Sequence, residues 1–418
     1  MTTFSIPKPV YPDCLDIFEK IPILDSIERG DEQKIFPTNS LNESSIDFSF
    51  ETDRNVFTDL RKIDLCLKVK LVKDGGTKVV EAGDEVSLVN NSMHSLFSNC
   101  EVYFNNIQVH TTNGLYAHKS FISNEFSNTK GTKESISCCQ GYTYEVKPGD
   151  AADPTIQARQ TTNLAETEYY GELPVEIFHC KGLLLPNINV RIKLIRSRPQ
   201  FYLLTKSTEN IVALITNAYL KIRSVTIDDT AFKSVKNQLM KEPARYNSLE
   251  LCPKTFIIPR GQNQYIQENI FNNAPIRTIA IAMNTNKAFT GDKKTNPFHY
   301  QKFGLREIKI CRGNQVVVHI DTTENCVPYV TTMRALKFDQ DGPNVKINEF
   351  EDHYCLVFDL TSTQQSDLMT FYQDVVAASL RLELFFKEDL KETIEVIIAG
   401  EKLSTIFIDK EGTVTKNG

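Results

Sequence analysis

Apolar and polar residues alternate with a period of two along much of this chain. The clearest runs are IDFSF at 46–50, IDLCLKVKL at 63–71 and AYLKIR at 218–223. Successive side chains of a β-strand point to opposite faces, so this pattern predicts strands with one apolar and one polar face. Several short strands separated by turn residues are typical of a β-sandwich or barrel.

Two β-hairpins are predicted, one in each half of the chain. The run CEVYFNNIQVH at 100–110 has Asn105-Asn106 at its centre, and EIKICRGNQVVVH at 307–319 has Gly313-Asn314. Asn and Gly tolerate the positive φ angles that tight hairpin turns need. Four apolar residues near these turns are expected to face the cores: Phe104, Ile107, Ile310 and Val316.

The hairpins belong to an internal repeat. The first follows MHSLF at 93–97, and the second follows FHYQKF at 298–303. A later pair of runs, VEIF at 175–178 and NVRI at 189–192, has an expected counterpart in LELF at 382–385 and EVII at 395–398. The spacing is 14 residues from Glu176 to Val190 and 13 from Glu383 to Val396. The shared order predicts one β domain present twice.

The 418 residues are enough for two such domains. Residues 230–242 carry Phe232, Val235 and Leu239 at helical spacing and end before Pro243, which predicts a short amphipathic helix between the domains. We expect its apolar face to be buried at the junction. The predicted division is an N-terminal arm at 1–32, a first domain at 33–229, a connector at 230–244, a second domain at 245–411 and a tail at 412–418. Residues 147–168 are polar and are predicted to form a long surface loop.

The sequence offers few residues for catalysis or metal binding. Motifs of the HxH, HExxH, GxSxG and GxxxxGK[ST] types are absent, and the ten cysteines form no CxxC pair. We expect free thiols, including the adjacent Cys138 and Cys139. Asp228-Asp229 is the strongest candidate for an acid/base pair of carboxylates. Its place between a strand and a helix, however, predicts that Asp229 is an N-cap. The histidines are predicted to be hydrogen-bonded structural residues: His94, His110, His118, His179, His299, His319 and His353.

Charge and hydropathy argue against two further classes, nucleic-acid-binding proteins and membrane-spanning proteins. The net charge of -6 argues against a broad nucleic-acid-binding face. The strongest basic cluster, Arg191, Lys193, Arg196 and Arg198, alternates with apolar residues and is expected to be the polar face of one strand. Residues 1–10 do not read as a signal peptide, and no run approaches the ~18 apolar residues of a membrane span. We therefore predict a non-enzymatic protein without catalytic, cofactor-binding or metal-binding residues.

Ordered motifs along nearly the whole chain resemble those of one protein family. They are LDIFEKIP at 15–22, SIERG at 26–30, FPTNSL at 36–41, VNNSMHSLFS at 89–98 and VEIFHCKGLLLPNINVRIKL at 175–194, then KTFIIPRG at 254–261, NPFHY at 296–300, FDLT at 358–361, ETIEVI at 392–397 and IFID at 406–409. Together they resemble the major capsid proteins of Polinton/Maverick elements and adintovirus-like viruses, which are related to those of large DNA viruses. Residues 339–351 match no motif of that family.

This resemblance implies an all-β fold of two tandem eight-stranded jelly rolls, with a few short helices in the connections. It also implies a homotrimer of pseudo-hexagonal outline that contacts neighbouring capsomers and penton or minor capsid proteins. The implied location is the virion capsid, assembled inside the host cell, with no cofactor and no specific nucleic-acid partner.

Three other functions are kept as alternatives. A penton or minor capsid protein usually has a single jelly roll, which the internal repeat disfavours. A carbohydrate-binding or adhesion module would be expected to carry exposed Trp, and this chain has none. An enzyme is the weakest alternative, because the sequence lacks a catalytic constellation.

Overall fold

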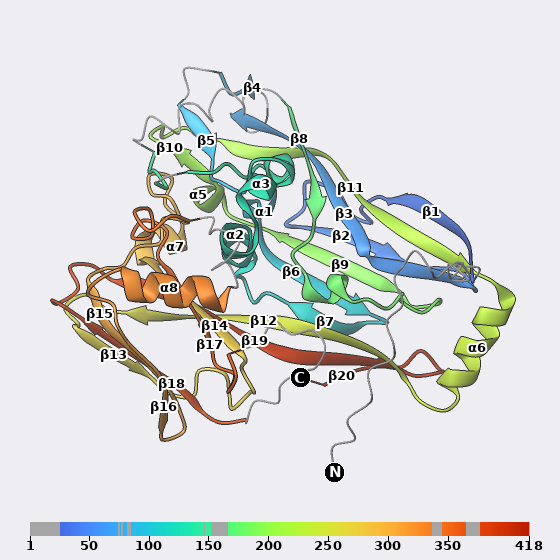
Figure 1. The fold of residues 1–418 in the computed structure, drawn as a ribbon. Helices are drawn as coiled ribbons and strands as arrows, with labels where there is room; N and C mark the ends of the chain where they lie inside the picture. Colours follow the sequence, from blue (N-terminus) through green and yellow to red (C-terminus); the bar gives the residue numbers. More distant parts are fainter. Residues whose placement is uncertain are drawn as a thin grey trace, which may run out of the picture.

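The computed structural model describes residues 26–73, 76, 78–81, 85–145, 147–151, 166–336, 345–364 and 377–417. These residues form antiparallel sheets joined by turns and short helices (Figure 1). Cys14, most of the expected N-terminal arm and most of the expected loop at 147–168 lie outside the described residues.

The first half contains two main sheets. One has the order β1 (Ile27–Ile35), β11 (Val212–Ile227), β3 (Val56–Lys73) and β8 (Thr167–Glu172). The other has the order β2 (Ser45–Phe50), β9 (Val190–Arg196), β6 (Phe97–Phe104) and β7 (Ile107–Thr111). Three short strands are added: β4 (Lys78–Val79) pairs with β3, and β5 (Val86–Leu88) pairs with β10 (Leu203–Thr205).

The second half also contains two main sheets. One has the order β12 (Ala244–Ile258), β19 (Ile394–Ile408), β14 (Thr278–Thr285) and β17 (Cys355–Asp359). The other has the order β13 (Gln264–Gln267), β18 (Leu380–Phe386), β15 (Leu305–Arg312) and β16 (Gln315–Asp321). The short strand β20 (Val414–Asn417) pairs with β19.

The two halves have the same topology. Apart from the short strands β4, β5, β10 and β20, the described residues of each half form eight strands, which can be numbered one to eight along the chain. In both halves the sheets then have the orders 1-8-3-6 and 2-7-4-5. This arrangement of eight strands in two packed antiparallel sheets is a jelly roll. The predicted hairpins, β6–β7 and β15–β16, are strands four and five of their respective halves.

The topology corrects the second part of the predicted repeat. Residues 175–178 are not a strand, because Glu176–His179 form the 3-10 helix η5. The seventh strand is β9 in the first half and β18 in the second, so the run at 190–192 corresponds to 382–385. A four-residue V-E-I-F alternation fits a strand and a single helical turn equally well, which explains the error.

Alternation places the apolar residues in the cores, as predicted. Along β2, Ile46, Phe48 and Phe50 are buried and their neighbours are partly exposed. Phe104 and Ile310, at the fourth strands, are also fully buried. The expectation for the fifth strands is wrong, because Ile107 is 45% exposed and Val316 is 51% exposed. Both follow the turn on a strand at the edge of its sheet, where one side lacks a neighbouring strand.

Strands cross two of the expected domain limits. The limit at residue 32 lies inside β1, which pairs with β11 over its length, and most of the expected tail at 412–418 belongs to β20. An edge strand needs only backbone hydrogen bonds to one neighbour, so these polar segments can join a sheet despite their weak apolar pattern.

Short helices lie in the connections. They are α1 (Ser92–Ser95), α2 (Tyr116–Ser127), α3 (Lys130–Lys133), η4 (Ile136–Gln140), η5 (Glu176–His179), α5 (Pro199–Tyr202), α6 (Asp229–Leu239), α7 (Asn286–Thr290) and α8 (Cys326–Ala335). Within the described part of the chain, every helix is too short or too polar to cross a lipid bilayer.

The predicted connector helix exists as α6, between β11 and β12. Its N-cap is Asp228 rather than Asp229, because the Asp228 carboxylate accepts hydrogen bonds from the backbone N–H groups of Thr230 and Ala231. Phe232 is buried edge-to-face against Phe57 of the first half. Val235 and Leu239 are only partly buried, and Figure 1 shows α6 at one end of the molecule. The helix therefore connects the halves without forming the centre of their junction.

Candidate functional site: the junction between the two jelly rolls

An aromatic cluster joins the two halves beside helix α2. The helix carries Phe121, whose ring stacks on Phe298 of the second half with centroids 4.4 Å apart and planes 2° apart. One turn earlier, His118 Nδ1 lies 2.9 Å from the hydroxyl of Tyr300. The His118 ring also stacks on Phe289 at 5.1 Å. Phe121, Phe298 and Tyr300 are buried, and large aromatic rings contribute much of the packing energy of such a junction.

A buried ionic cluster lies at the other end of α2. Glu125 Oε1 is 3.2 Å from Lys133 Nζ and 3.3 Å from His353 Nδ1 of the second half. Tyr142 donates its hydroxyl hydrogen to the second oxygen of Glu125. His353 Nε2 lies 2.9 Å from the backbone carbonyl of Glu145, which fixes the ring from its other side. A charged group of each half is therefore buried against the other.

The pKa shifts agree with a charged cluster. Burial alone would raise the pKa of Glu125, but the hydrogen bond with His353 and the charge of Lys133 lower it to about 2. Burial would lower the pKa of His353, but its bond to Glu125 raises that pKa above the usual value. Burial lowers the pKa of Lys133, against the opposing effect of Glu125. Removing one member would leave an uncompensated buried charge, which is costly.

A two-stranded ribbon extends the contact. The strands β12 and β19 pair from Ala244 with Ile408 to Ile258 with Ile394, whereas β14 covers β19 only from Ile394 to Glu401. Beyond Glu401, where β14 no longer pairs with β19 and β20 is added at residues 405–408, the ribbon packs on the first half. Tyr246 donates its hydroxyl hydrogen to the carbonyl of Leu183 at 3.1 Å and accepts from the backbone N–H of Leu185 at 3.1 Å.

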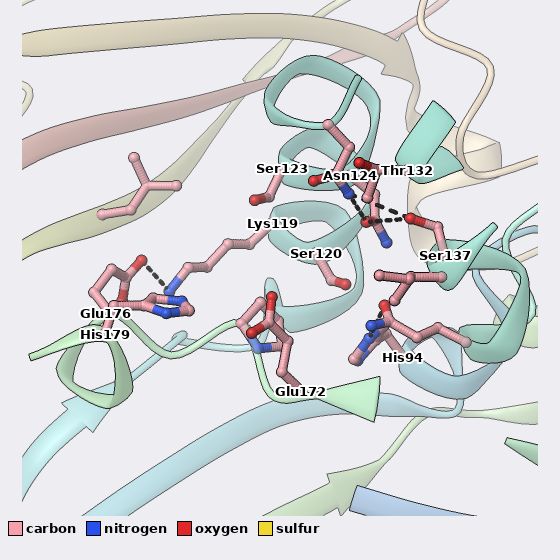
Figure 2. A pocket seen from close by; sticks show the side chains of 15 residues that line it. His94, Lys119, Ser120, Ser123, Asn124, Thr132, Ser137, Glu172, Glu176 and His179 are labelled. Atoms are coloured by element: carbon pink, nitrogen blue, oxygen red, sulfur yellow. Dashed lines mark hydrogen bonds and ion pairs between the residues drawn. The ribbon is translucent and has the colours of Figure 1, made fainter. Parts of the chain in front are cut away.

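A polar cavity of about 210 Å³ lies on the other side of α2 (Figure 2). Its floor includes Lys119, whose Nζ is 2.6 Å from Glu176 Oε1. His94 lines another wall, with Nδ1 2.8 Å from the Tyr116 hydroxyl and Nε2 3.1 Å from Gln140 Oε1. Leu251 of the ribbon closes part of the cavity. Lys119, Glu176 and His94 of the cavity lining are thus engaged with neighbours in the fold.

Six of the seven histidines have structural partners among the described residues, as the sequence predicts, whereas His179 is exposed. Burial lowers the pKa of His94 to about 4 and that of His118 to about 3, so both rings are neutral near pH 7. Burial also lowers the pKa of His110, which lies 3.5 Å from Glu176. On the surface, His319 Nε2 is 2.6 Å from Glu307.

The remaining sequence candidates do not converge on one site. Within the described residues, no three His, Cys, Asp or Glu side chains are grouped so that they could hold a metal ion. The nine described cysteines, including Cys138 and Cys139, are free thiols. Arg191 and Lys193 lie on the partly exposed face of β9, as predicted, and the Arg191 guanidinium lies 4.4 Å from the Tyr103 ring centroid.

The sequence did not reveal the junction itself. Glu125, Lys133 and His353 come from separate segments, and none of them belongs to a recognisable motif. One available signal was FHYQKF at 298–303, because it supplies Phe298 and Tyr300 to the aromatic cluster. The sequence pattern indicates only that this run is one half of the repeat.

Comparison of the sequence with known proteins does not identify a family for this chain. No family model matches the chain. An uncharacterized protein of Caenorhabditis elegans is 18% identical over 232 residues, and this match spans 55% of each chain. The chain therefore spans about half the length of this curated relative.

Comparison of the structure with solved structures finds similar chains in several viruses. The chain is similar over its whole length to a chain of the Sputnik virophage cryo-EM structure, with a TM-score of 0.68, 10% identity and 94% of that chain covered. It matches the PBCV-1 virus capsid with a TM-score of 0.62 at 9% identity, covering 96% of this chain and 99% of the other. It matches the mavirus major capsid protein with a TM-score of 0.54 at 10% identity, covering all of this chain and 97% of the other.

These similarities, at such low identity, establish the fold. They agree with the strand orders, which repeat the same eight-stranded arrangement in both halves. The chain is all-β and has the double jelly-roll fold, two tandem jelly rolls with short helices in their connections.

Proposed function

We propose that this chain is a major capsid protein that trimerises into pseudo-hexagonal capsomers and tiles an icosahedral shell. Its partners are two further copies of itself, neighbouring capsomers and penton or minor capsid proteins. Its place is the virion capsid, assembled inside the host cell. On the basis of the sequence motifs, we assign it to the capsid proteins of Polinton/Maverick elements and adintovirus-like viruses.

One observation carries the proposal: two jelly rolls of the same topology are fixed to each other by a buried junction. A trimer of such chains presents six similar domains, which is the number that a hexagonal lattice position needs. The stacked Phe121 and Phe298 and the buried Glu125–His353 pair hold the halves in one orientation. A lattice unit needs this rigidity, because its lateral contacts must keep their geometry.

The solved structures support the same function. The Sputnik, PBCV-1 and mavirus chains come from virus particles or carry the name of major capsid protein, and the matches cover both jelly rolls. We keep the division into 33–229 and 245–411 as the two structural units of the proposed tile, with the strand β1 added to the first.

Size-exclusion chromatography with multi-angle light scattering tests the proposal. The expected result is a compact species of three times the chain mass of 47.5 kDa. A monomer at all concentrations, together with binding to a glycan array, would favour the adhesion-module alternative instead.

A further inference from the structure

A cleft of about 300 Å³ lies between the two jelly rolls, beside the aromatic cluster around His118. The first half supplies residues of α2, of α5 and of the end of β9, and the second half supplies residues of α7. The volume is at the lower end of the range of small-molecule sites. We call it the arginine cleft, and its lining includes His118, Arg196, Ser197, Arg198, Phe201 and Phe289.

The walls of the arginine cleft are aromatic. The Phe289 ring stacks on His118 with centroids 5.1 Å apart, and the Phe201 ring meets His118 edge-to-face at 5.4 Å. Both phenylalanines are only partly buried. The helices α5 and α7 lie side by side here (Figure 1), and Gly291 permits their approach, because a Cβ atom there would be 3.2 Å from the backbone of Gln200 and Phe201. Each jelly roll thus supplies one aromatic wall.

Three buried polar atoms of the lining have no hydrogen-bond partner among the described residues: Arg196 Nε, Ser197 Oγ and His118 Nε2. Ser197 is 9% exposed and His118 is 3% exposed. When the Tyr300 hydroxyl, 2.9 Å from His118 Nδ1, donates to that nitrogen, Nε2 carries the ring hydrogen, so all three atoms can donate. Most buried polar side-chain atoms of folded proteins are hydrogen-bonded, so three unpartnered donors around one cleft indicate a ligand site.

The charge of the arginine cleft is positive. Among the described residues, no Asp or Glu lines it, and neither Arg196 nor Arg198 forms a salt bridge. Arg196 Nη2 donates to the backbone carbonyl of Leu41, and burial lowers the pKa of Arg196. A partly buried guanidinium without a carboxylate partner is costly, and its planar donors match a carboxylate or a phosphate. The lining therefore favours an anion.

We propose that the arginine cleft binds a small organic anion, in which a carboxylate or phosphate group is attached to an aromatic body. Arg196, Arg198 and the Ser197 hydroxyl donate to the anionic group. The aromatic body lies between Phe201 and Phe289. Because these two walls belong to different jelly rolls, the bound anion contacts both and stabilises their junction. This ligand site goes beyond the proposed capsid function and does not depend on it.

Phenyl phosphate and benzoate are the probes, because each joins one anionic group to one ring. Saturation-transfer difference NMR measures their binding to the full chain, and thermal melts measure the stabilisation. We expect both anions to bind saturably and to raise the melting temperature, since they bind the folded chain and not the unfolded one. Benzylamine has the ring with the opposite charge, and inorganic phosphate has the charge without the ring. Each should bind at least about tenfold more weakly than phenyl phosphate.

Substitutions in the lining test the same site. Ser197→Ala removes a buried hydroxyl that has no partner among the described residues, and Arg198→Gln removes an exposed charge, so both variants should fold like the wild type. Each should weaken the binding of phenyl phosphate by about tenfold. The matched control is Arg191→Gln, because Arg191 lies on β9 but outside the cleft, and this variant should bind like the wild type. Circular dichroism melts without ligand confirm that each variant is folded.

The expected result is saturable binding of the anions by the wild type that is weakened in S197A and R198Q but not in R191Q. Three results would each overturn the proposal. They are no saturable binding of either anion, binding of benzylamine or inorganic phosphate as tight as that of phenyl phosphate, and unchanged binding by folded S197A and R198Q. None of them alters the proposed capsid function, which the oligomeric state of the chain tests.

Discussion

Glu125 of the first jelly roll lies with Oε1 3.3 Å from Nδ1 of His353 in the second, and both side chains are almost completely buried. Lys133 completes the cluster at 3.2 Å from the same oxygen. Glu125 and Lys133 belong to the first half and His353 to the second, so the contact with His353 exists only when the halves are packed together. The cluster therefore makes the orientation of the two jelly rolls part of the folded state.

Replacing Glu125 by Gln should destabilise the protein by about 3–5 kcal/mol, because Lys133 would be left as a buried cation without its carboxylate. Chemical denaturation monitored by circular dichroism measures this change. The control is Lys130→Gln, which removes an exposed pair with Glu134 and should cost less than about 1 kcal/mol. An equal, small effect of both changes would show that the buried cluster does not hold the halves together.

Acid should destabilise the protein through its buried neutral histidines. The folded-state pKa is about 4 for His94 and about 3 for His118, below the usual 6.5. Between pH 6.5 and these values the unfolded chain binds protons that the folded chain does not, so stability falls as the pH falls. His118→Phe should make the free energy of unfolding less dependent on pH between 6.5 and 4. An unchanged slope for this variant would contradict the assignment.

Truncation of Phe298 to Ala should cost about 3–5 kcal/mol, since its ring is 1% exposed and stacks on Phe121. The expected loss appears as a lower midpoint of thermal or urea unfolding. Phe36→Ala is the comparison, because Phe36 is 59% exposed and its loss should have little effect. A tolerated F298A variant would mean that the aromatic cluster is not essential to the junction.

The two adjacent aspartates at the start of α6 should behave differently. Asp228→Ala removes both side-chain hydrogen bonds to the first turn of the helix and should lower the melting temperature by about 2 °C. Those hydrogen bonds also hold the pKa of Asp228 below its usual range. Asp229→Ala keeps the cap and should have the smaller effect in calorimetry. The reverse ranking would support Asp229 as the cap.

Local patterns predicted much of the fold. The Asn105-Asn106 and Gly313-Asn314 turns were found from residue type alone, because few residues adopt positive φ, and Asn105, Asn106 and Gly313 do adopt it. The strand β2 was found because a half-buried strand shows a period of two. Errors arose where the pattern was short or lay at an edge, as for η5 and for Ile107 and Val316.

The junction could not be predicted in the same way. A buried ion pair leaves no periodic signal, so Glu125 and His353 look like ordinary surface residues in the sequence. Their pairing depends on the packing of two domains, a contact between positions 228 residues apart that local propensities do not encode. The pairing of Lys119 with Glu176 at 2.6 Å likewise depends on packing between distant segments, so the sequence does not predict it.

Electron cryo-microscopy of the purified oligomer tests the central claim most directly. If the chain is a capsid tile, two-dimensional averages should show a particle of hexagonal outline, with three copies contributing six jelly rolls in a ring. Particles that contain one chain, or a two-fold dimer that pairs identical surfaces, would contradict the account.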